Sequence, residues 1–324
     1  MKIVIANNPE QPTPPLLYGG TQRRSDFIAR GLAARRYDVT LLCGPNSTCQ
    51  VNKVEVNSAA MSEEKHYVEW ARYNKWDCLL DMTSLHLLGQ KPYLPDGAKT
   101  LSMMSGDPFK LYAHDALRNR MYVSQPFADF YGCPDHPVIS NIPTDNPEEF
   151  PLGDGSGGYF LYIGTVRPEK GVHLAAMACK RAGFPLIVAG PVQDRFRPYF
   201  STFKDSMEYI GEIGGEFRLE LLGKAKALLY PVLWCDASPL AVKESLLCGT
   251  PVIGCPNGGI MEDIDENNGL LIRQDHFTRG VLTTCDTRWN RENIRRQAII
   301  RMNPKNYLDK VEALLVKVAN GEQW

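Results

Sequence analysis

Short apolar runs alternate with stretches of helical periodicity along the whole chain. Near the N-terminus, a buried strand is predicted over Lys2–Ala6, a helix over Arg23–Arg35 and a second strand over Val39–Cys43. A strand, helix and strand joined by short links are typical of a parallel sheet, because the helix carries the chain back to the start of the next strand. The pattern therefore predicts an α/β fold built on parallel sheets.

The same alternation continues along the rest of the chain. Further strands are predicted at Cys78–Met82, Thr100–Met104, Met121–Ser124, Val138–Ile139, Tyr159–Ile163, Pro185–Ala189, Ser206–Ile210, Ala227–Tyr230 and Pro251–Cys255. Further helices are predicted at Ser62–Tyr73, Val172–Arg181, Phe217–Lys224, Leu240–Cys248 and Asn306–Val318. Two successive sets of strands and helices indicate two Rossmann-like domains.

A segment rich in proline and glycine separates the two sets. Residues 141–158 contain Pro143, Pro147, Pro151 and four glycines, which neither a helix nor a central strand tolerates. We therefore expect an N-terminal domain over residues 1–150 and a C-terminal domain over residues 151–305. The last helical segment, residues 306–324, is a candidate for packing back on the N-terminal domain.

Charge and cysteine content narrow the class of function. Lys and Arg number 36 against 37 Asp and Glu, and this balance gives no field that would concentrate nucleic acid or anionic lipid. Nine cysteines without a C-x-x-C pair are typical of a reducing compartment. The apolar run at Met1–Ala6 is too short for a signal-peptide core or a membrane span, so we expect a soluble, cytoplasmic protein.

The most informative segment runs from Trp234 to Ile253. Ser238 followed by Pro239 predicts a helix start, because serine accepts hydrogen bonds from unpaired amides and proline needs no acceptor at the first helical position. The amides of such a first turn, here at Leu240 and Ala241, attract phosphate through hydrogen bonds and the helix dipole.

Within this segment, Asp236 is separated by seven residues from Glu244, and the sequence C-G-T-P-V-I follows. This arrangement closely resembles the E-x7-E region of family 4 retaining glycosyltransferases, which have the GT-B fold. The resemblance implies that Asp236 faces the sugar of a nucleotide-sugar donor and that Glu244 binds the ribose hydroxyls. A carboxylate suits a ribose diol, because it accepts two hydroxyl hydrogen bonds at once.

A second segment, Y-I-G-T-V-R-P-E-K-G at 162–171, is similar to the family's G-R-x-x-x-E-K-G loop. The resemblance implies that Lys170 holds the donor diphosphate and that Gly164 lies against the donor. The family's arginine position is occupied by Thr165, and Arg167 stands two residues later, from where it would reach the diphosphate by a different path. Lys170, Arg167 and Asp236 are the predicted catalytic residues.

The remaining candidates contact the donor in the family. Gly19, Gly20 and Thr21 resemble its N-terminal glycine loop, and Ser238, Pro239, Leu240 and Ala241 with Glu244 complete the predicted donor site. Two departures from the family concern the donor sugar. Ser105, followed by Asp107, stands where the family has a histidine near the 6-hydroxyl of the sugar, and Pro239 replaces a glycine. The absence of the histidine suggests either a sugar without that hydroxyl, such as a pentose or a deoxy sugar, or a sugar held differently, by Ser105 or Asp107, which are also candidates for contacting the acceptor.

The resemblance implies a retaining transfer from a nucleoside diphosphate sugar, most simply a UDP or GDP sugar, to an acceptor hydroxyl in the cleft between the domains. The acceptor is left open between a glycan, a lipid-linked glycan and a small molecule, and a nucleic acid is disfavoured by the charge balance. The alternative is a binding protein of GT-B fold that holds a sugar nucleotide or glycan without turnover.

No cofactor or metal is expected. Asp263 and Asp265 match a D-x-D metal pattern but are interpreted as an acidic surface stretch, and His86 is interpreted as structural. A dehydrogenase is disfavoured, because no G-x-G-x-x-G follows the strands predicted to begin each domain.

Overall fold

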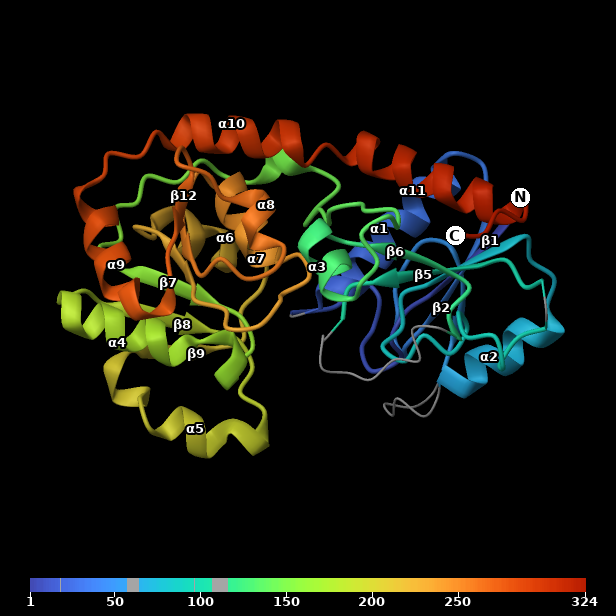
Figure 1. Cartoon of the computed structure of the whole chain (residues 1–324), viewed down its shortest axis with the longest axis horizontal. Helices are drawn as coiled ribbons and strands as arrows, with labels where there is room; N and C mark the ends of the chain where they lie inside the picture. The colour runs from blue at the N-terminus through green and yellow to red at the C-terminus, as the bar shows by residue number, and fades with distance from the viewer. Residues whose placement is uncertain (18, 57–63, 96, 107–115) are drawn as a thin grey trace. The chain divides into compact units, whose positions relative to one another are not determined.

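The computed structural model describes residues 1–17, 19–56, 64–95, 97–106 and 116–324. They form two compact units, which Figure 1 shows: residues 1–145 together with 304–324, and residues 146–303. Each unit contains a parallel sheet of six strands with helices packed on it. The predicted α/β fold with two Rossmann-like sheets is confirmed.

In the first unit the strands lie in the order β3-β2-β1-β4-β5-β6. The strands are β1 (Lys2–Ala6), β2 (Asp38–Cys43), β3 (Asn52–Glu55), β4 (Cys78–Asp81), β5 (Thr100–Met104) and β6 (Asn119–Tyr122). The helices are α1 (Gly20–Ala34), α2 (Glu64–Tyr73), α3 (Gln125–Phe130) and α11 (Pro304–Ala319). Every residue of β4 and β5 is buried, as is typical of central strands of a parallel sheet that is covered on both faces.

Helix α11 belongs to the first unit, although it ends the chain. It packs beside α1, where a side chain at Gly31 would meet Leu308 at 2.5 Å, so the glycine permits close helix packing. Arg35 at the end of α1 pairs with Asp309 at 2.7 Å and also with Glu312. The first unit is therefore built from both ends of the chain.

In the second unit the order is β12-β11-β10-β7-β8-β9. The strands are β7 (Phe160–Ile163), β8 (Leu186–Ala189), β9 (Glu208–Gly211), β10 (Leu228–Tyr230), β11 (Val252–Gly254) and β12 (Gly269–Leu271). The helices are α4 (Val172–Ala182), α5 (Arg197–Ser201), α6 (Gly215–Lys224), α7 (Leu240–Leu247), α8 (Ile260–Asp263), α9 (Phe277–Asp286) and α10 (Arg291–Arg301). A short 3-10 helix at Pro168–Lys170 precedes α4.

The core of the second unit lies between its sheet and two helices. Figure 1 shows α4 and α9 side by side, and their apolar faces, including Val172, Phe277 and Val281, are buried with residues of β7 and β8. Helix α7 packs against α10.

Most predicted strands and helices are present, but the helices α3, α5, α8, α9 and α10 were not predicted, and several strands differ. The edge strands β3 and β12 were not among the predicted strands, and Val138–Ile139 is not a strand, since only Val138 forms an isolated bridge, to Tyr122. Strand β6 ends at Tyr122, so that Ser124 caps α3 by accepting a hydrogen bond from the amide of Phe127 at 3.3 Å.

No helix in the described part of the chain is both long enough and apolar enough to span a bilayer.

Candidate functional site

The second unit has a topological switch point between β7 and β10. The chain runs from β7 outward through β8 and β9, and then returns to β10 on the other side of β7. In open parallel sheets the loops at the carboxyl ends of the two switch-point strands diverge and leave room for a ligand. The loop after β7 carries Arg167 and Lys170, and the loop after β10 carries Trp234 and Asp236. The topology therefore brings together residues that are more than sixty positions apart.

Glycine at position 171 allows the two loops to meet. Gly171 has a φ of 70°, and a Cβ atom there would lie 1.9 Å from the carbonyl oxygen of Pro231. Only glycine fits, because any side chain would be strained by the backbone angle and would overlap the second loop. The amide of Leu233 also donates to the carbonyl of Glu169 at 2.8 Å. These contacts place Lys170 directly beside the second loop.

Lys170 and Asp236 form an ion pair that includes Tyr230. The ammonium of Lys170 and the hydroxyl of Tyr230 both donate to the same carboxylate oxygen of Asp236, and Lys170 also contacts the Tyr230 hydroxyl at 3.3 Å. Burial disfavours the charged form of Asp236, but the Lys170 charge and the donated hydrogen bonds outweigh it, so the pKa of Asp236 is lowered. Two of the three predicted catalytic residues are thus in direct contact.

Arg167, the third predicted catalytic residue, lies near Lys170 because both side chains contact the ring of Trp234. Its guanidinium carbon lies 4.7 Å from the ring centroid of Trp234 and 5.7 Å from that of Phe196. It also pairs with Glu169 at 3.4 Å. The Nζ atom of Lys170 lies 5.0 Å from the same Trp234 ring. Both cations therefore share one aromatic side chain.

The helix after the second loop starts at Leu240, as predicted, but Ser238 is not its N-cap residue. Pro239, not Ser238, occupies the N-cap position, and Leu240 is the first helical residue. Pro239 has extended angles and cannot cap with a side chain, so the Ser238 cap was wrong. Ser238 is buried next to this turn, and the amides of Leu240 and Ala241 lie in the first turn, where an α-helix offers them no internal acceptor.

Glu244 lies further along α7 and is buried. Its carboxylate pairs with Arg218 of α6 at 3.1 Å, and only 2% of the Glu244 side chain is exposed.

The amide of Gly164 donates to the carbonyl of Ala189 at 3.0 Å, so this N–H group takes part in the hydrogen bonding between strands β7 and β8. The structure places Gly164 at the end of β7, at the start of the loop that carries Arg167.

The acidic stretch that contains Asp263 and Asp265 is only partly exposed, because Asp265 is exposed and Asp263 is buried. Both carboxylate oxygens of Asp263 accept from Lys243 at 2.5 Å, and each side chain of this pair is 2% exposed. The surface interpretation of Asp263 was therefore wrong, because a buried lysine requires a buried carboxylate partner. Among the described residues, no group of three His, Cys, Asp or Glu side chains is placed to hold a metal ion.

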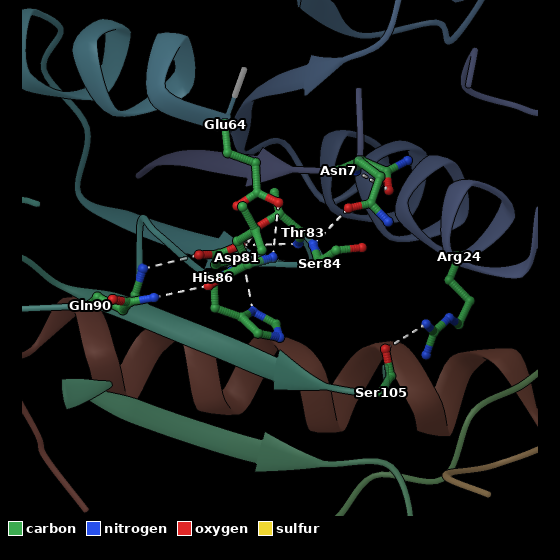
Figure 2. Close-up of polar contacts among 12 residues, drawn as sticks. Asn7, Arg24, Glu64, Asp81, Thr83, Ser84, His86, Gln90 and Ser105 are labelled. Atoms are coloured by element: carbon green, nitrogen blue, oxygen red, sulfur yellow. Dashed lines mark hydrogen bonds and ion pairs between the residues drawn. The ribbon is translucent and has the colours of Figure 1, made fainter. Parts of the chain in front are cut away.

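In the first unit, the predicted glycine loop precedes α1. Gly19 is the N-cap residue with a φ of 156°, and a Cβ atom there would lie 2.7 Å from Pro15. Figure 2 shows Ser105 facing Arg24, which donates to its hydroxyl at 3.0 Å and to Thr21 at 3.4 Å. Asp107 lies outside the described residues. Ser105 is thus held by a buried arginine of α1.

A second polar cluster lies at the carboxyl end of β4 (Figure 2). The hydroxyl of Thr83 contacts Asp81 at 2.6 Å and Glu64 at 2.9 Å, and the His86 ring lies 3.7 Å from Asp81. Glu64, Asp81 and His86 are each at most 1% exposed. Burial and the charge of Asp81 raise the pKa of Glu64 to about 7. The cluster fastens the loop after β4 to the first residue of α2.

The residues that sequence reasoning missed in these sites include Tyr230, Trp234, Arg218 and Arg24. Tyr230 and Trp234 stand in the segment with Asp236, so their aromatic character beside predicted cations was an available signal. Arg218 and Arg24 are ordinary polar residues of helices in the sequence. Their contacts follow from tertiary packing, and we find no local signal for them.

Comparisons with known proteins agree with this fold. Residues 148–299 match the family model of glycosyl transferases group 1. The curated relative D-rhamnosyltransferase WbpZ of Pseudomonas aeruginosa is 25% identical over 104 residues, which cover 31% of this chain and 27% of the relative. The match thus spans about a quarter of that protein's length.

Two solved structures resemble the whole chain. The glycosyltransferase AviGT4, involved in avilamycin A biosynthesis, has a TM-score of 0.76 and 24% identity, with 100% of this chain and 99% of that chain covered. HepE of Anabaena, solved with UDP and glucose, has a TM-score of 0.74 and 14% identity, with 98% and 100% covered. The chain therefore has the GT-B fold, and its residues 148–299 match the model of group 1 glycosyl transferases.

Proposed function

We propose that this chain transfers a glycosyl group from a nucleoside diphosphate sugar to an acceptor hydroxyl, with retention of the anomeric configuration. The observation that carries the proposal is the cluster of Arg167, Lys170 and Asp236 at the switch point of the second unit. Cleavage of a sugar nucleotide leaves a diphosphate, and two fixed cations stabilise the charge that develops on it. The group 1 match covers the same residues.

Each residue has a role in this proposal. Lys170 and Arg167 bind the diphosphate together with the first-turn amides of α7, Glu244 binds the ribose, and Asp236 faces the sugar. Asp236 is ionised and held in place by Lys170 and Tyr230, which suits a group that accepts sugar hydroxyls. The departing diphosphate takes the acceptor proton, and no covalent intermediate is needed. The two cations and the first-turn amides of α7 offset the diphosphate charge, so that no metal ion is needed.

For the donor we propose a UDP or GDP sugar. HepE is a solved structure with UDP and glucose, which supports a uridine nucleotide. The substitution at Ser105 favours a sugar without a 6-hydroxyl, and the curated relative is named a D-rhamnosyltransferase, rhamnose being a 6-deoxyhexose. A site without a partner for that hydroxyl does not discriminate against its absence.

We place the reaction in a reducing compartment, such as the cytoplasm. All nine cysteines are free thiols, and seven of them are buried, which is the pattern of thiols that serve as apolar core groups. The acceptor is a glycan, a lipid-linked glycan or a small molecule.

The test is a panel of UDP and GDP sugars, each with hexose, 6-deoxyhexose and pentose forms. Thermal shift identifies the bound donor, because a specific ligand raises apparent stability by mass action. Release of UDP or GDP with added acceptors then measures turnover. Binding together with release supports the proposed transferase. Binding without release across the panel would support the non-catalytic alternative, and absence of both would refute a sugar-nucleotide site.

A further inference from the structure

Arg167 is shifted by two residues along the chain, so its side chain needs a contact that directs it toward the proposed diphosphate site. In the loop after β7, this chain has Thr165 where the G-R-x-x-x-E-K-G loop of the family that it resembles has arginine. Arg167 stands two residues later, after Val166. Val166 is fully buried, and its amide bonds to the carbonyl of Pro191 at 2.9 Å, so the backbone here is fixed. Arg167 must therefore be directed toward the diphosphate by its side chain.

Trp234 supplies the contact that does this. The centroid of its ring lies 4.7 Å from the Arg167 guanidinium carbon and 5.0 Å from the Lys170 Nζ atom, so that both charges are attracted to one aromatic ring. Phe196 also contacts Arg167, at 5.7 Å, but has no such contact with Lys170 among the described interactions. Trp234 is 8% exposed, and its neighbour two residues later is Asp236.

Two cations held close together repel each other unless anions or π-electrons offset their charge. Here Glu169 pairs with Arg167, Asp236 pairs with Lys170, and the ring of Trp234 attracts both cations. A bound diphosphate would replace the carboxylates as the anion, whereas the ring would stay. The aromatic side chain is thus the part of the arrangement that keeps the spacing of the cations in both states.

We propose that Trp234 is a positioning residue that holds Arg167 and Lys170 as one cation pair for the diphosphate leaving group. The proposal rests on the proposed function, since it assigns the pair to a diphosphate. It explains how this chain tolerates threonine at position 165: the arginine is recruited from position 167 by a ring in the loop after β10. Trp234 acts through the two cations and is not itself required to touch the reacting atoms.

The experiment compares Trp234→Leu and Trp234→Phe with wild type, using the donor identified by the panel. The leucine variant keeps an apolar side chain but lacks the π-face, so we expect kcat to fall by about tenfold or more with a change in KM of less than about threefold. The phenylalanine variant restores the face and should recover most of kcat. Phe196→Leu, which removes a ring near Arg167 alone, should cost less than Trp234→Leu.

A double-mutant cycle shows whether the effect passes through the arginine. If it does, Trp234→Leu in the Arg167→Ala background should cost clearly less than in wild type. Fully additive losses, or wild-type kcat in Trp234→Leu, would overturn the proposal. A melting temperature and far-ultraviolet circular dichroism spectrum for each variant identify loss of fold, and the phenylalanine variant keeps the test decisive if the leucine variant unfolds.

A ligand-free readout separates this proposal from the proposed function. In protein labelled with 15N-arginine, the side-chain Nε–H signal of Arg167, assigned with Arg167→Lys, should carry a ring-current shift that disappears in Trp234→Leu and persists in Trp234→Phe. An unchanged signal would overturn the contact. If the wild type binds and turns over no sugar nucleotide while the signal behaves as expected, the transferase assignment fails and the Trp234–Arg167 contact stands.

Discussion

At the scale of single residues, Asp236 has an unusually crowded environment for a carboxylate that is proposed to face a sugar. Lys170 and Tyr230 both donate to one of its oxygens. Lys170 therefore has an anionic partner before any donor binds. A diphosphate must compete with Asp236 for that ammonium, and the carboxylate also repels the incoming phosphates.

Asp236→Asn should consequently bind UDP or GDP more tightly while turning over more slowly. The amide removes the competing charge, which we expect to be worth roughly 1 kcal/mol, or about fivefold in affinity. Turnover should fall at least about tenfold, because the sugar loses an ionised acceptor. Isothermal titration calorimetry with each diphosphate measures the first effect. Asp265→Asn, at an exposed carboxylate of the same unit, is the control and should change neither. Weaker binding by Asp236→Asn would contradict this account.

The buried cluster around Thr83 makes a second prediction at this scale. The Thr83 hydroxyl has one proton and faces carboxylate oxygens of both Asp81 and Glu64, so one of the two acids must supply a proton of its own. Glu64, whose pKa is raised to about 7, is that acid. Its folded pKa lies above the unfolded value, so its contribution is full at low pH and is lost as the pH rises from about 4.5 to about 7.

We therefore expect Glu64→Gln to remove a pH dependence of stability. In the wild type, this group should lower the free energy of unfolding by about 3 kcal/mol across that pH window. Glutamine can accept from the Leu85 amide and donate to Thr83, as the protonated acid does. Urea unfolding of both proteins at pH 5 and pH 8 measures the difference. Glu64→Ala should be destabilised at both pH values, and a glutamine variant with wild-type pH dependence would contradict the assignment of the proton.

At the scale of elements, sequence patterns identify the buried strands well and the edge strands poorly. Strand β5 is buried at every position and was predicted with its observed bounds. Strand β3 contains Asn52, Lys53 and Glu55 and has no buried residue, so its sequence carries no apolar signal. Val138–Ile139 is apolar but follows Pro137, which cannot donate to a neighbouring strand, and only one residue pairs. The apolar pattern therefore follows burial more closely than strand formation, although the edge strand β9, which has no buried residue, was also predicted, at Ser206–Ile210.

The turn at Gly171 yields a prediction with a matched control. Gly171 and Gly183 have φ values of 70° and 76°, but an added Cβ meets Pro231 at 1.9 Å in the first case and nothing within 4 Å in the second. Gly183→Ala should cost about 1 kcal/mol from backbone strain alone, and Gly171→Ala about 3 kcal/mol or more. Urea denaturation of the two variants tests this difference. Equal losses would show that the loops after β7 and β10 do not meet as described.

At the scale of the whole molecule, the sequence predicted two parallel-sheet units and the segments that form the second-unit site. Lys170 and Asp236 were predicted separately and prove to be in contact. Their pairing could not be predicted from local pattern, because it depends on the strand order that places β10 beside β7. The same holds for Arg24 beside Ser105 and for Lys243 beside Asp263, which are tertiary contacts between distant segments.

Whether activity requires a divalent metal ion depends on several segments of the protein together. We expect full activity in excess chelator, because Arg167, Lys170 and the first turn of α7 provide positive charge and amide donors for the diphosphate. The aspartate that resembled part of a metal motif is already paired with Lys243. Turnover with and without EDTA, followed by addition of magnesium or manganese, is the measurement. Activity that is abolished by EDTA and restored by either ion would show that the diphosphate site is incomplete as proposed.

Lys170 is proposed to stabilise the leaving diphosphate, and Lys170→Ala removes the charge that would do so. Negative charge on the bridging oxygen grows as the sugar bond breaks, so kcat should fall by about a hundredfold or more, while the dissociation constant of the free diphosphate should rise by less than about tenfold. The measurement is kcat from diphosphate release beside calorimetric affinity for the same diphosphate, in wild type and variant. Equal losses in the two quantities, or an unchanged kcat, would contradict the account.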